Sequence, residues 1–218
     1  MIKLSASSAK LLKQCERAYY IKTKLKIPID WQPPWLDFGC RVHKVIETGE
    51  KDENPEINAC AASYNNDFPD KPDFCEVRFD CEDSTGALDA IFLRPDNTAI
   101  IVDIKTCSKW TARELTDYQA NLYISVWPSI QKQLGITHRL THFEWREIRK
   151  KDYKTKVTSY AVEEFQGIRH DLTVQLAEAI IENDEIPEPN FEFSCKFCLW
   201  KDTCQKLLTE TTHWLDRI

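Results

Sequence analysis

Two β-rich runs joined by a short polar turn constrain this chain more than any other feature of its sequence. The runs span residues 86–93 and 98–104, and the Pro-Asp-Asn segment at 95–97 has the residue types that turns favour. A three-residue turn sets a register in which Asp89 lies directly opposite Asp103. The sequence therefore predicts an antiparallel hairpin in which two carboxylates face each other.

The charges on this hairpin indicate a cation site. Side chains alternate between the faces of a strand, so Asp103 and Lys105 share one face and Ile104 points away from it. Like charges directly opposite each other destabilise a sheet by about 0.2–1 kcal/mol. Asp89 and Asp103 therefore favour a divalent metal between them, although a surface salt bridge between Asp103 and Lys105 is the simpler alternative.

A helix is predicted to follow the hairpin. Residues 111–114 read Thr-Ala-Arg-Glu, which is the pattern of a capping box at a helix N-terminus. Gln119 and Tyr123 are spaced i,i+4 and form a pair on the same side of this helix. An accidental pair on a helix surface has the same spacing. The apolar stripe of the helix comprises Leu115, Tyr118, Leu122 and Val126.

Upstream of the hairpin, the sequence predicts a helix at about residues 36–49. It carries His43 and Glu47 four residues apart on one face, with Gly39 one turn earlier, where another backbone can approach closely. A partly buried helix histidine is the common alternative to a ligand role for His43. The strand expected at residues 75–81 adds Glu76 as a weak candidate that either reaches the metal or pairs near Arg78.

The remaining pattern completes an α/β domain with a central mixed sheet flanked by helices. Ser5 or Ser7 is expected to cap a first helix that runs to about Lys24, and a proline-containing linker at 27–34 follows it. A short helix is expected around 57–64, strands at 140–148 and 157–162, and an amphipathic helix at 163–183.

The chain of 218 residues has nine cysteines, and their odd number argues against a framework of disulfides. The first residues also lack the apolar region of a signal peptide, so we expect a reducing, cytoplasmic setting. Three cysteines cluster as Cys195-x2-Cys198-x5-Cys204, which suits a metal; for zinc, His213 is the nearest candidate for a fourth ligand. The other cysteines outside this cluster and the first helix are expected to be small buried residues: Cys40, Cys60, Cys75, Cys81 and Cys107.

The net charge of −6 does not favour binding to nucleic acid, but the charges are unevenly distributed. Basic residues dominate the first 26 positions and the run 146–156, whereas the acids concentrate between residues 47 and 103. This asymmetry suits a phosphate track beside an acidic metal pocket, although a solvated surface is the commoner cause of a charge run. No apolar run approaches the roughly 20 residues of a membrane span.

Several of these features occur together and in a fixed order. Gly86-x-x-Asp89, Asp103-Ile-Lys105 and Gln119-x-x-x-Tyr123, preceded by His43, resemble the motifs of the PD-(D/E)XK nuclease superfamily in its RecB-type branch. Asp103 stands where many relatives have Glu. The resemblance covers nearly the whole chain.

This resemblance implies a restriction-endonuclease-like core in one domain, residues 1–218, that hydrolyses DNA, most often as an exonuclease, with Mg²⁺ or Mn²⁺. It assigns Lys105 to catalysis beside Asp89 and Asp103, and it assigns Gln119 and Tyr123 to holding the DNA backbone. The implied metal ligands are His43, Asp89, Asp103 and the carbonyl of Ile104.

One part of the branch also carries an iron–sulfur cluster held by one N-terminal and three C-terminal cysteines. Cys15 with Cys195, Cys198 and Cys204 is similar to that arrangement, and four thiolates suit a [4Fe–4S] cluster. The N-terminal helix (about 1–27) and the C-terminal segment (about 187–218) would then form the cluster lobe. The expected substrate is DNA with a free end or a single-stranded region, and a helicase, recombination or integration protein is a possible partner. A non-catalytic subunit that binds DNA ends, or a structural cluster module, remains the alternative.

Overall fold

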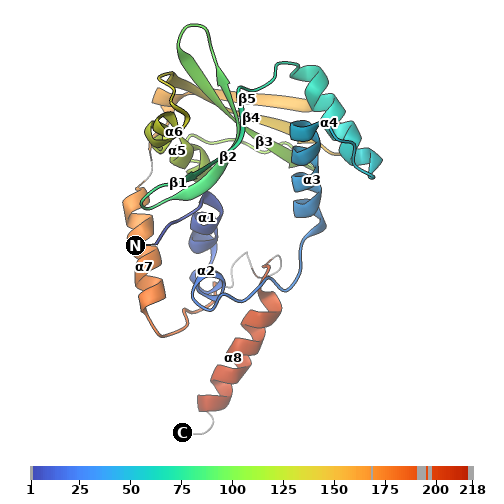
Figure 1. Ribbon diagram of the computed structural model, residues 1–218. Helices are drawn as coiled ribbons and strands as arrows, with labels where there is room; N and C mark the ends of the chain where they lie inside the picture. The colour runs from blue at the N-terminus through green and yellow to red at the C-terminus, as the bar shows by residue number, and fades with distance from the viewer. Residues whose placement is uncertain (1, 168, 191–194, 196–197, 216–218) are drawn as a thin grey trace. The chain divides into compact units, whose positions relative to one another are not determined.

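The structure is a computed structural model that describes residues 2–167, 169–190, 195 and 198–215 (Figure 1). The chain divides into two compact units, each with its own core. One unit combines residues 1–33 with residues 169–218, and the other is the continuous stretch Pro34–Ile168. Among the described residues, no helix is both long enough and apolar enough to cross a membrane.

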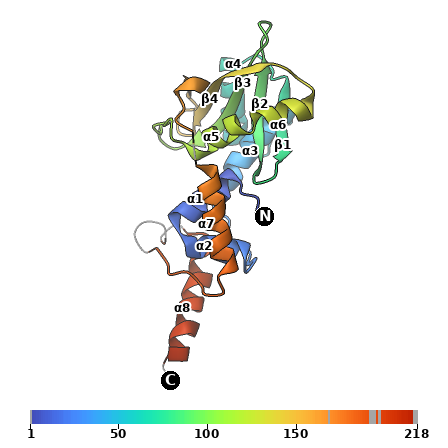
Figure 2. The same cartoon turned by 90° about the vertical axis from the view of Figure 1, so that its left-hand side faces the viewer.

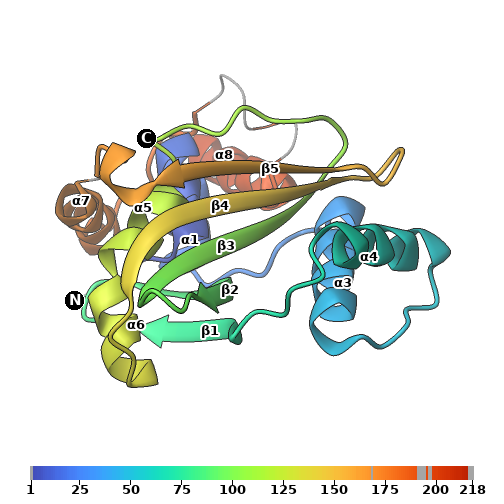
Figure 3. The ribbon, with the colours of Figure 1, turned by 90° about the horizontal axis from the view of Figure 1, so that it is seen from above.

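A five-stranded mixed sheet forms the centre of the continuous unit (Figure 3). Its strands lie side by side in chain order: β1 (Phe74–Asp80), β2 (Thr85–Leu93), β3 (Thr98–Cys107), β4 (Arg139–Arg149) and β5 (Thr155–Ala161). The β3–β4 pair is parallel, and the other three pairs are antiparallel. The predicted α/β fold with a central mixed sheet is confirmed.

The hairpin register is the predicted one. Ala90 pairs with Val102, so the next positions along the two strands are Asp89 and Asp103. The turn closes tightly because Asn97 adopts a left-handed φ of 61°, a conformation that asparagine tolerates better than most residues.

Helices cover both faces of the sheet. Helices α3 (Pro34–Thr48) and α4 (Pro55–Asp67) cover one face. Their core joins helix residues to the inward-facing residues of the strands: Val42, Ile57, Cys60, Tyr64, Ala90, Phe92, Val102, Ile104 and Ile148. Helix α5 (Tyr118–Ser125) packs on the opposite face, where the Tyr123 ring contacts Phe79 and Phe143. Helix α6 (Trp127–Leu134) follows directly, with Pro128 in its first turn.

The helix expected to begin at Thr111 begins instead at Tyr118. Asp117 is its N-cap, and the Asp117 carboxylate accepts the Ala120 N–H at 3.0 Å. The segment that carries the capping-box pattern is held as a loop because Arg113 donates to the fully buried Glu147 at 2.7 Å. This tertiary ion pair overrides the local helix signal.

The other unit is helical, with α1 (Ala6–Gln14), α2 (Glu16–Thr23), α7 (His170–Glu182) and α8 (Lys201–Leu215). Figure 2 shows α7 beside α1 and α2, and these three helices share a core. The first two were predicted as one helix, but the chain breaks at Cys15, where the backbone is extended (φ −163°, ψ 110°). The predicted helix at 163–183 is also shorter, because the 3₁₀ turn Val162–Glu164 ends before α7 begins.

Two glycines show why small residues are needed near the hairpin. A Cβ on Gly86 would lie 2.8 Å from the Phe79 ring, so this strand position admits no larger residue without displacing Phe79. A Cβ on Gly39 would lie 3.2 Å from Thr106 Oγ1, so the close approach at this helix position is to a side chain and not, as expected, to a backbone.

The prediction for the five remaining cysteines was mostly wrong. Cys60 is buried in the core between α4 and the sheet, but Cys40 and Cys75 are exposed, and Cys81 and Cys107 are half-buried. Cys40 is on the solvent-exposed side of helix α3, and Cys75 is exposed on strand β1, so neither is covered by the core.

Candidate functional site

Asp103 is the most deeply buried charged group of the hairpin. Its side chain has no solvent exposure, and Oδ1 accepts hydrogen bonds from Lys105 Nζ and Gln119 Nε2, both at 2.9 Å. Its second oxygen, Oδ2, is buried and has no hydrogen-bond partner among the described residues. A carboxylate oxygen is expensive to bury without a partner, so this atom is a natural position for a cation.

Helix α5 contacts Asp103 through the Gln119 side chain. Gln119 Nε2 also donates to the Tyr123 hydroxyl oxygen at 2.9 Å, so the i,i+4 pair acts as one unit. Tyr123 is only 5% exposed and packs among the aromatic residues of this face of the sheet. The pair therefore contacts the acidic hairpin directly, and its predicted contact with DNA stays a prediction.

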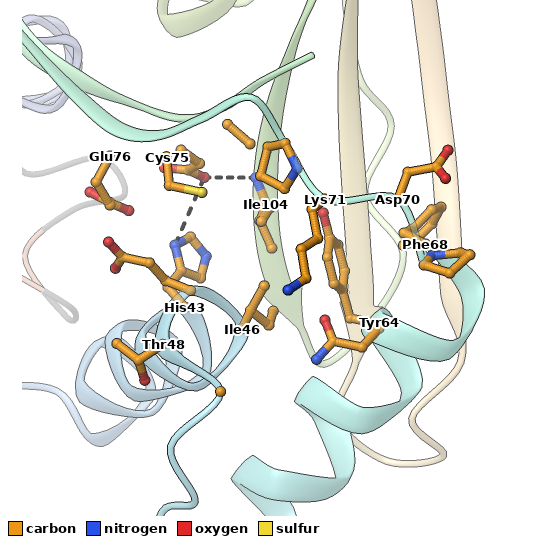
Figure 4. Close-up of a pocket in the computed structure, with 17 residues that line it drawn as sticks. His43, Ile46, Thr48, Tyr64, Phe68, Asp70, Lys71, Cys75, Glu76 and Ile104 are labelled. Carbon is orange, nitrogen blue, oxygen red and sulfur yellow. Dashed lines mark hydrogen bonds and ion pairs between the residues drawn. The ribbon is translucent and has the colours of Figure 1, made fainter.

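Asp89 links strand β3 of the hairpin to helix α3. Its Oδ2 accepts the backbone N–H of Ile104 at 2.7 Å and lies 3.8 Å from His43 Nδ1. The Ile104 bond fixes the Asp89 carboxylate across the hairpin, and His43 approaches from helix α3. Both contacts appear as dashed lines in Figure 4.

Glu76, which the sequence indicated only weakly, completes a group of three potential metal ligands with His43 and Asp89. One ligand atom from each of His43, Glu76 and Asp89 lies within 4.8 Å of the other two, and Figure 4 shows the His43 and Glu76 side chains on the same side of the pocket. Glu76 is on β1, and its backbone has a left-handed φ of 46°, which is uncommon for a residue with a side chain. No sequence signal reports that conformation, although the alternation of β1 did place Glu76 near the site.

These donors fit a hard divalent cation. Two carboxylates and an imidazole gather within 4.8 Å, and the unpartnered Oδ2 of Asp103 belongs to the same hairpin. Mg²⁺ and Mn²⁺ prefer oxygen ligands, and an imidazole nitrogen suits Mn²⁺ better than Mg²⁺. Asp103 itself lies outside the group of three, and Asp89, its neighbour across the hairpin, is the member that links Asp103 to that group.

Burial and charge shift the protonation of the site. Burial, opposed by Lys105 and assisted by neighbouring Asp89, raises the pKa of Asp103 to about 6. Burial alone would lower the pKa of Lys105, but Asp103 and Asp89 outweigh it, so the pKa is raised and the ammonium is retained. Burial also raises the pKa of Tyr123 to about 12, so the phenol stays protonated at neutral pH.

The predicted basic run at 146–156 is largely engaged in structure. The Arg146 guanidinium lies 4.6 Å from the Phe68 ring centroid and pairs with Glu144. Arg149 pairs with Asp152, and Lys150 lies 4.1 Å from the Phe38 ring centroid. Lys151 and Lys154 are the exposed cations of this run.

The helical unit gathers the four candidate cluster ligands. Cys15, Cys195, Cys198 and Cys204 line one cavity of about 140 Å³, together with apolar side chains, Lys201 and Gln205 of the same unit. Burial raises the pKa of Cys198 and of Cys204, and the neighbouring cysteines add to the effect. Residues 191–194, 196–197 and 216–218 of the predicted lobe lie outside the described residues, as does the side chain of His213.

A mixed five-stranded sheet whose hairpin carries Asp89, Asp103 and Lys105, with helices on both faces, has the arrangement of a restriction-endonuclease-like core. The chain belongs to the PD-(D/E)XK nuclease superfamily, whose family model matches residues 59–205. Comparison with curated proteins finds no match.

Comparison with solved structures finds similar proteins at low sequence identity. A protein from Eubacterium rectale described as a "Putative exonuclease" has a TM-score of 0.54 and 10% identity, covering 89% of this chain and 92% of that chain. The crystal structure of SSO0001 has a TM-score of 0.46 and 16% identity, covering 92% of this chain and 84% of that chain. The first of these supports the assignment of the fold.

Proposed function

We propose that this protein is a metal-dependent DNA nuclease that hydrolyses phosphodiester bonds. The observation that carries the proposal is Asp103, which is fully buried, is held through Oδ1 by Lys105 and Gln119, and keeps Oδ2 without a partner among the described residues. A purely structural ion pair would not require the second carboxylate of Asp89 beside it. Membership of a nuclease superfamily points the same way.

Each residue has a distinct role in this proposal. His43, Asp89, Asp103 and the Ile104 carbonyl would hold the divalent cation, with Glu76 as an added ligand. When bound, the cation supplies an activated water and neutralises charge on the transferred phosphoryl group. Lys105, which already contacts Asp103, would orient the attacking water and offset charge that develops on phosphate oxygens. Gln119 would keep the Asp103 carboxylate in position.

The name given to the Eubacterium rectale protein supports exonucleolytic cleavage as the mode of action. The test is digestion of DNA labelled at either end, with Mg²⁺, with Mn²⁺ and with EDTA. We expect metal-dependent release of short products by the wild type and none by the Asp103→Ala variant. Binding of DNA by the wild type without any cleavage in either metal would instead support a DNA-end-binding subunit.

We also propose that Cys15, Cys195, Cys198 and Cys204 hold a [4Fe–4S] cluster. Four thiols around one cavity of about 140 Å³ support this proposal, and Cys15 enters the cavity at the break between α1 and α2. The rival is zinc, which the same four thiolates also suit. Iron, zinc and acid-labile sulfide measured on anaerobically purified protein separate the two: stoichiometric zinc without iron would exclude the cluster.

A further inference from the structure

Arg17 is a buried cation that the proposed cleavage reaction does not use. It lies on α2, two positions after Cys15, and is only 3% exposed. Its Nη1 donates to the Pro187 carbonyl oxygen at 3.2 Å, but Nε and Nη2 are buried and have no hydrogen-bond partner among the described residues. An arginine side chain stays charged inside a protein, so burying it in this way is costly unless a negative charge lies nearby.

No carboxylate of the described residues supplies that charge. Arg17 forms no ion pair with any of them, and its acidic neighbour in the chain, Glu16, is exposed. Arg17 lies instead beside the cavity that the four cysteines line, called here the four-cysteine cavity. Cys15 and Ala18, on either side of Arg17 in the chain, line this cavity, and so does Pro189. Arg17 itself is not a lining residue, so it lies behind the cavity wall and away from solvent.

The charge of Arg17 acts on one of the candidate ligands. Burial raises the pKa of the Cys204 thiol, and Arg17 opposes this rise more than any other group does. Four neutral thiols would leave the guanidinium without an opposite charge. Four thiolates bring more negative charge than a zinc ion or a [4Fe–4S] core offsets, so a metal centre in this cavity keeps a net negative charge. The unpartnered guanidinium therefore fits the metal-bound form of the cavity and not the form with free thiols.

We propose that Arg17 is the counter-ion of a negatively charged metal–thiolate centre in the four-cysteine cavity. It makes no bond to the metal, and its fixed charge stabilises the thiolates from behind the cavity wall. Such a centre becomes more negative when it is reduced, so Arg17 stabilises the reduced state more than the oxidised state. This inference rests on the proposed metal site of the four cysteines and adds the residue that balances its charge.

Lys201 is the natural comparison for Arg17. Among the described residues that line the cavity it is the single lysine or arginine, but it is exposed, so water and salt screen its charge. A buried charge such as that of Arg17 is screened much less. We therefore expect Arg17 to control the properties of the metal centre and Lys201 to have little effect.

The test is the reduction potential of the purified 218-residue chain. It is measured by anaerobic titration with dithionite, followed by the electron paramagnetic resonance signal of the reduced cluster. Arg17→Gln keeps an N–H donor for Pro187 but removes the charge, whereas Arg17→Lys keeps the charge. Lys201→Gln is the matched control. If the wild type is purified with zinc, a single iron ion bound in its place supplies the same readout, because that centre also becomes more negative on reduction.

We expect Arg17→Gln to shift the reduction equilibrium about tenfold or more toward the oxidised form, which corresponds to about 59 mV for one electron. Arg17→Lys and Lys201→Gln should stay within about threefold of wild type, because the first keeps the buried charge and the second removes a screened one. Loss of iron from Arg17→Gln, with iron retained in Arg17→Lys, would support the same conclusion, because the charge would then be needed to hold the centre.

The outcomes separate this proposal from the metal site on which it rests. Iron bound by wild type and by Arg17→Gln at equal potentials would overturn the counter-ion while leaving the metal site in place. Equal shifts, or equal losses of iron, in Arg17→Gln and Arg17→Lys would also overturn it, because the shape of the arginine and not its charge would then matter. A wild-type protein that binds neither iron nor zinc would overturn the metal site itself and, with it, the counter-ion.

Discussion

At the scale of single residues, Asp103 stores unfavourable electrostatic energy in the metal-free protein. In the folded state its carboxyl has a pKa of about 6, whereas 3.8 is usual for aspartate. Between these values the folded protein binds more protons than the unfolded chain, so the contribution of Asp103 to stability falls as pH rises. Above pH 6 the full cost is present. This is the reverse of an ordinary surface carboxylate, whose salt bridges stabilise a protein at neutral pH.

Asp103→Asn should therefore stabilise the protein in EDTA. At pH 8 we expect a gain on the order of 2 kcal/mol over wild type, because the amide cannot ionise, and at pH 4 we expect no difference. Urea denaturation at both pH values measures this. A variant less stable than wild type at pH 8 would show that Asp103 is a structural ion-pair partner of Lys105 and not a metal ligand.

Lys105→Ala should separate catalysis from binding. The Lys105 side chain is 34% exposed, and its ammonium donates to Asp103 Oδ1 at 2.9 Å, so the side chain lies at the edge of the site. We expect cleavage to fall by about 10²–10³-fold, while calorimetry detects binding of Mn²⁺ as before. Loss of Mn²⁺ binding would indicate that Lys105 mainly organises the carboxylates.

At the scale of elements, helix α5 positions the Asp103 carboxylate through Gln119 and Tyr123. Tyr123→Phe keeps the ring that packs on Phe79 and Phe143, and it removes only the acceptor of the Gln119 amide. We expect a loss of about 1 kcal/mol in stability and a severalfold fall in kcat with KM unchanged. Tyr123→Ala should cost about 3–5 kcal/mol, because the packed ring is lost.

Steady-state kinetics on labelled DNA, with urea denaturation alongside, measures both variants. A rise in KM with kcat unchanged in Tyr123→Phe would indicate direct contact with DNA, as the sequence motif predicts, in place of positioning through Gln119.

The β1–β2 pair depends on the absence of a side chain at Gly86. Gly86→Ala brings a Cβ to 2.8 Å from the Phe79 ring, and we expect a destabilisation of about 1–3 kcal/mol, measured by thermal or urea denaturation. The matched control combines Gly86→Ala with Phe79→Leu. If the clash is the cause, Phe79→Leu should restore part of the stability that Gly86→Ala removes. If the two substitutions instead destabilise the protein additively, the cause lies in the backbone.

The sequence predicted the elements whose signals are local and failed where distant contacts decide. Alternation and the turn at 95–97 were sufficient for the hairpin register, and with it for the facing of Asp89 and Asp103. The start of α5 was missed because the buried Arg113–Glu147 pair, formed with a strand 34 positions away, holds the preceding loop. Glu76, which lies close to His43, was indicated only weakly, and no residue pattern encodes the left-handed backbone that it adopts.

At the scale of the whole molecule, the chain comprises two units, and each candidate site lies entirely within one of them. The carboxylate site belongs to the continuous unit, Pro34–Ile168, and the four-cysteine cavity belongs to the unit built from residues 1–33 and 169–218. We therefore expect the two sites to respond separately to substitution.

Cys198→Ser tests this separation. We expect loss of iron and of the visible absorption, because metal binding is coupled to folding of the segments that supply the ligands. Hydrogen exchange measured by mass spectrometry should accelerate in residues 2–33 and 169–190, while β2 and β3 stay protected. Cys81→Ser, a half-buried cysteine outside the cavity, is the control and should keep its iron. Iron retained by Cys198→Ser would remove Cys198 from the ligand set.

The arrangement of the units also fixes an order of assembly on the ribosome. All of Pro34–Ile168 is synthesised before α7 and α8 exist, so this unit can fold while the helical unit is still incomplete. Cys15 and Cys195 lie 180 positions apart, an interval of roughly 10–40 seconds at about 5–20 residues per second. During that time Cys15 has none of its three candidate partners. A metal held by all four cysteines would therefore enter the cavity only after the whole unit that carries the carboxylate site has been synthesised.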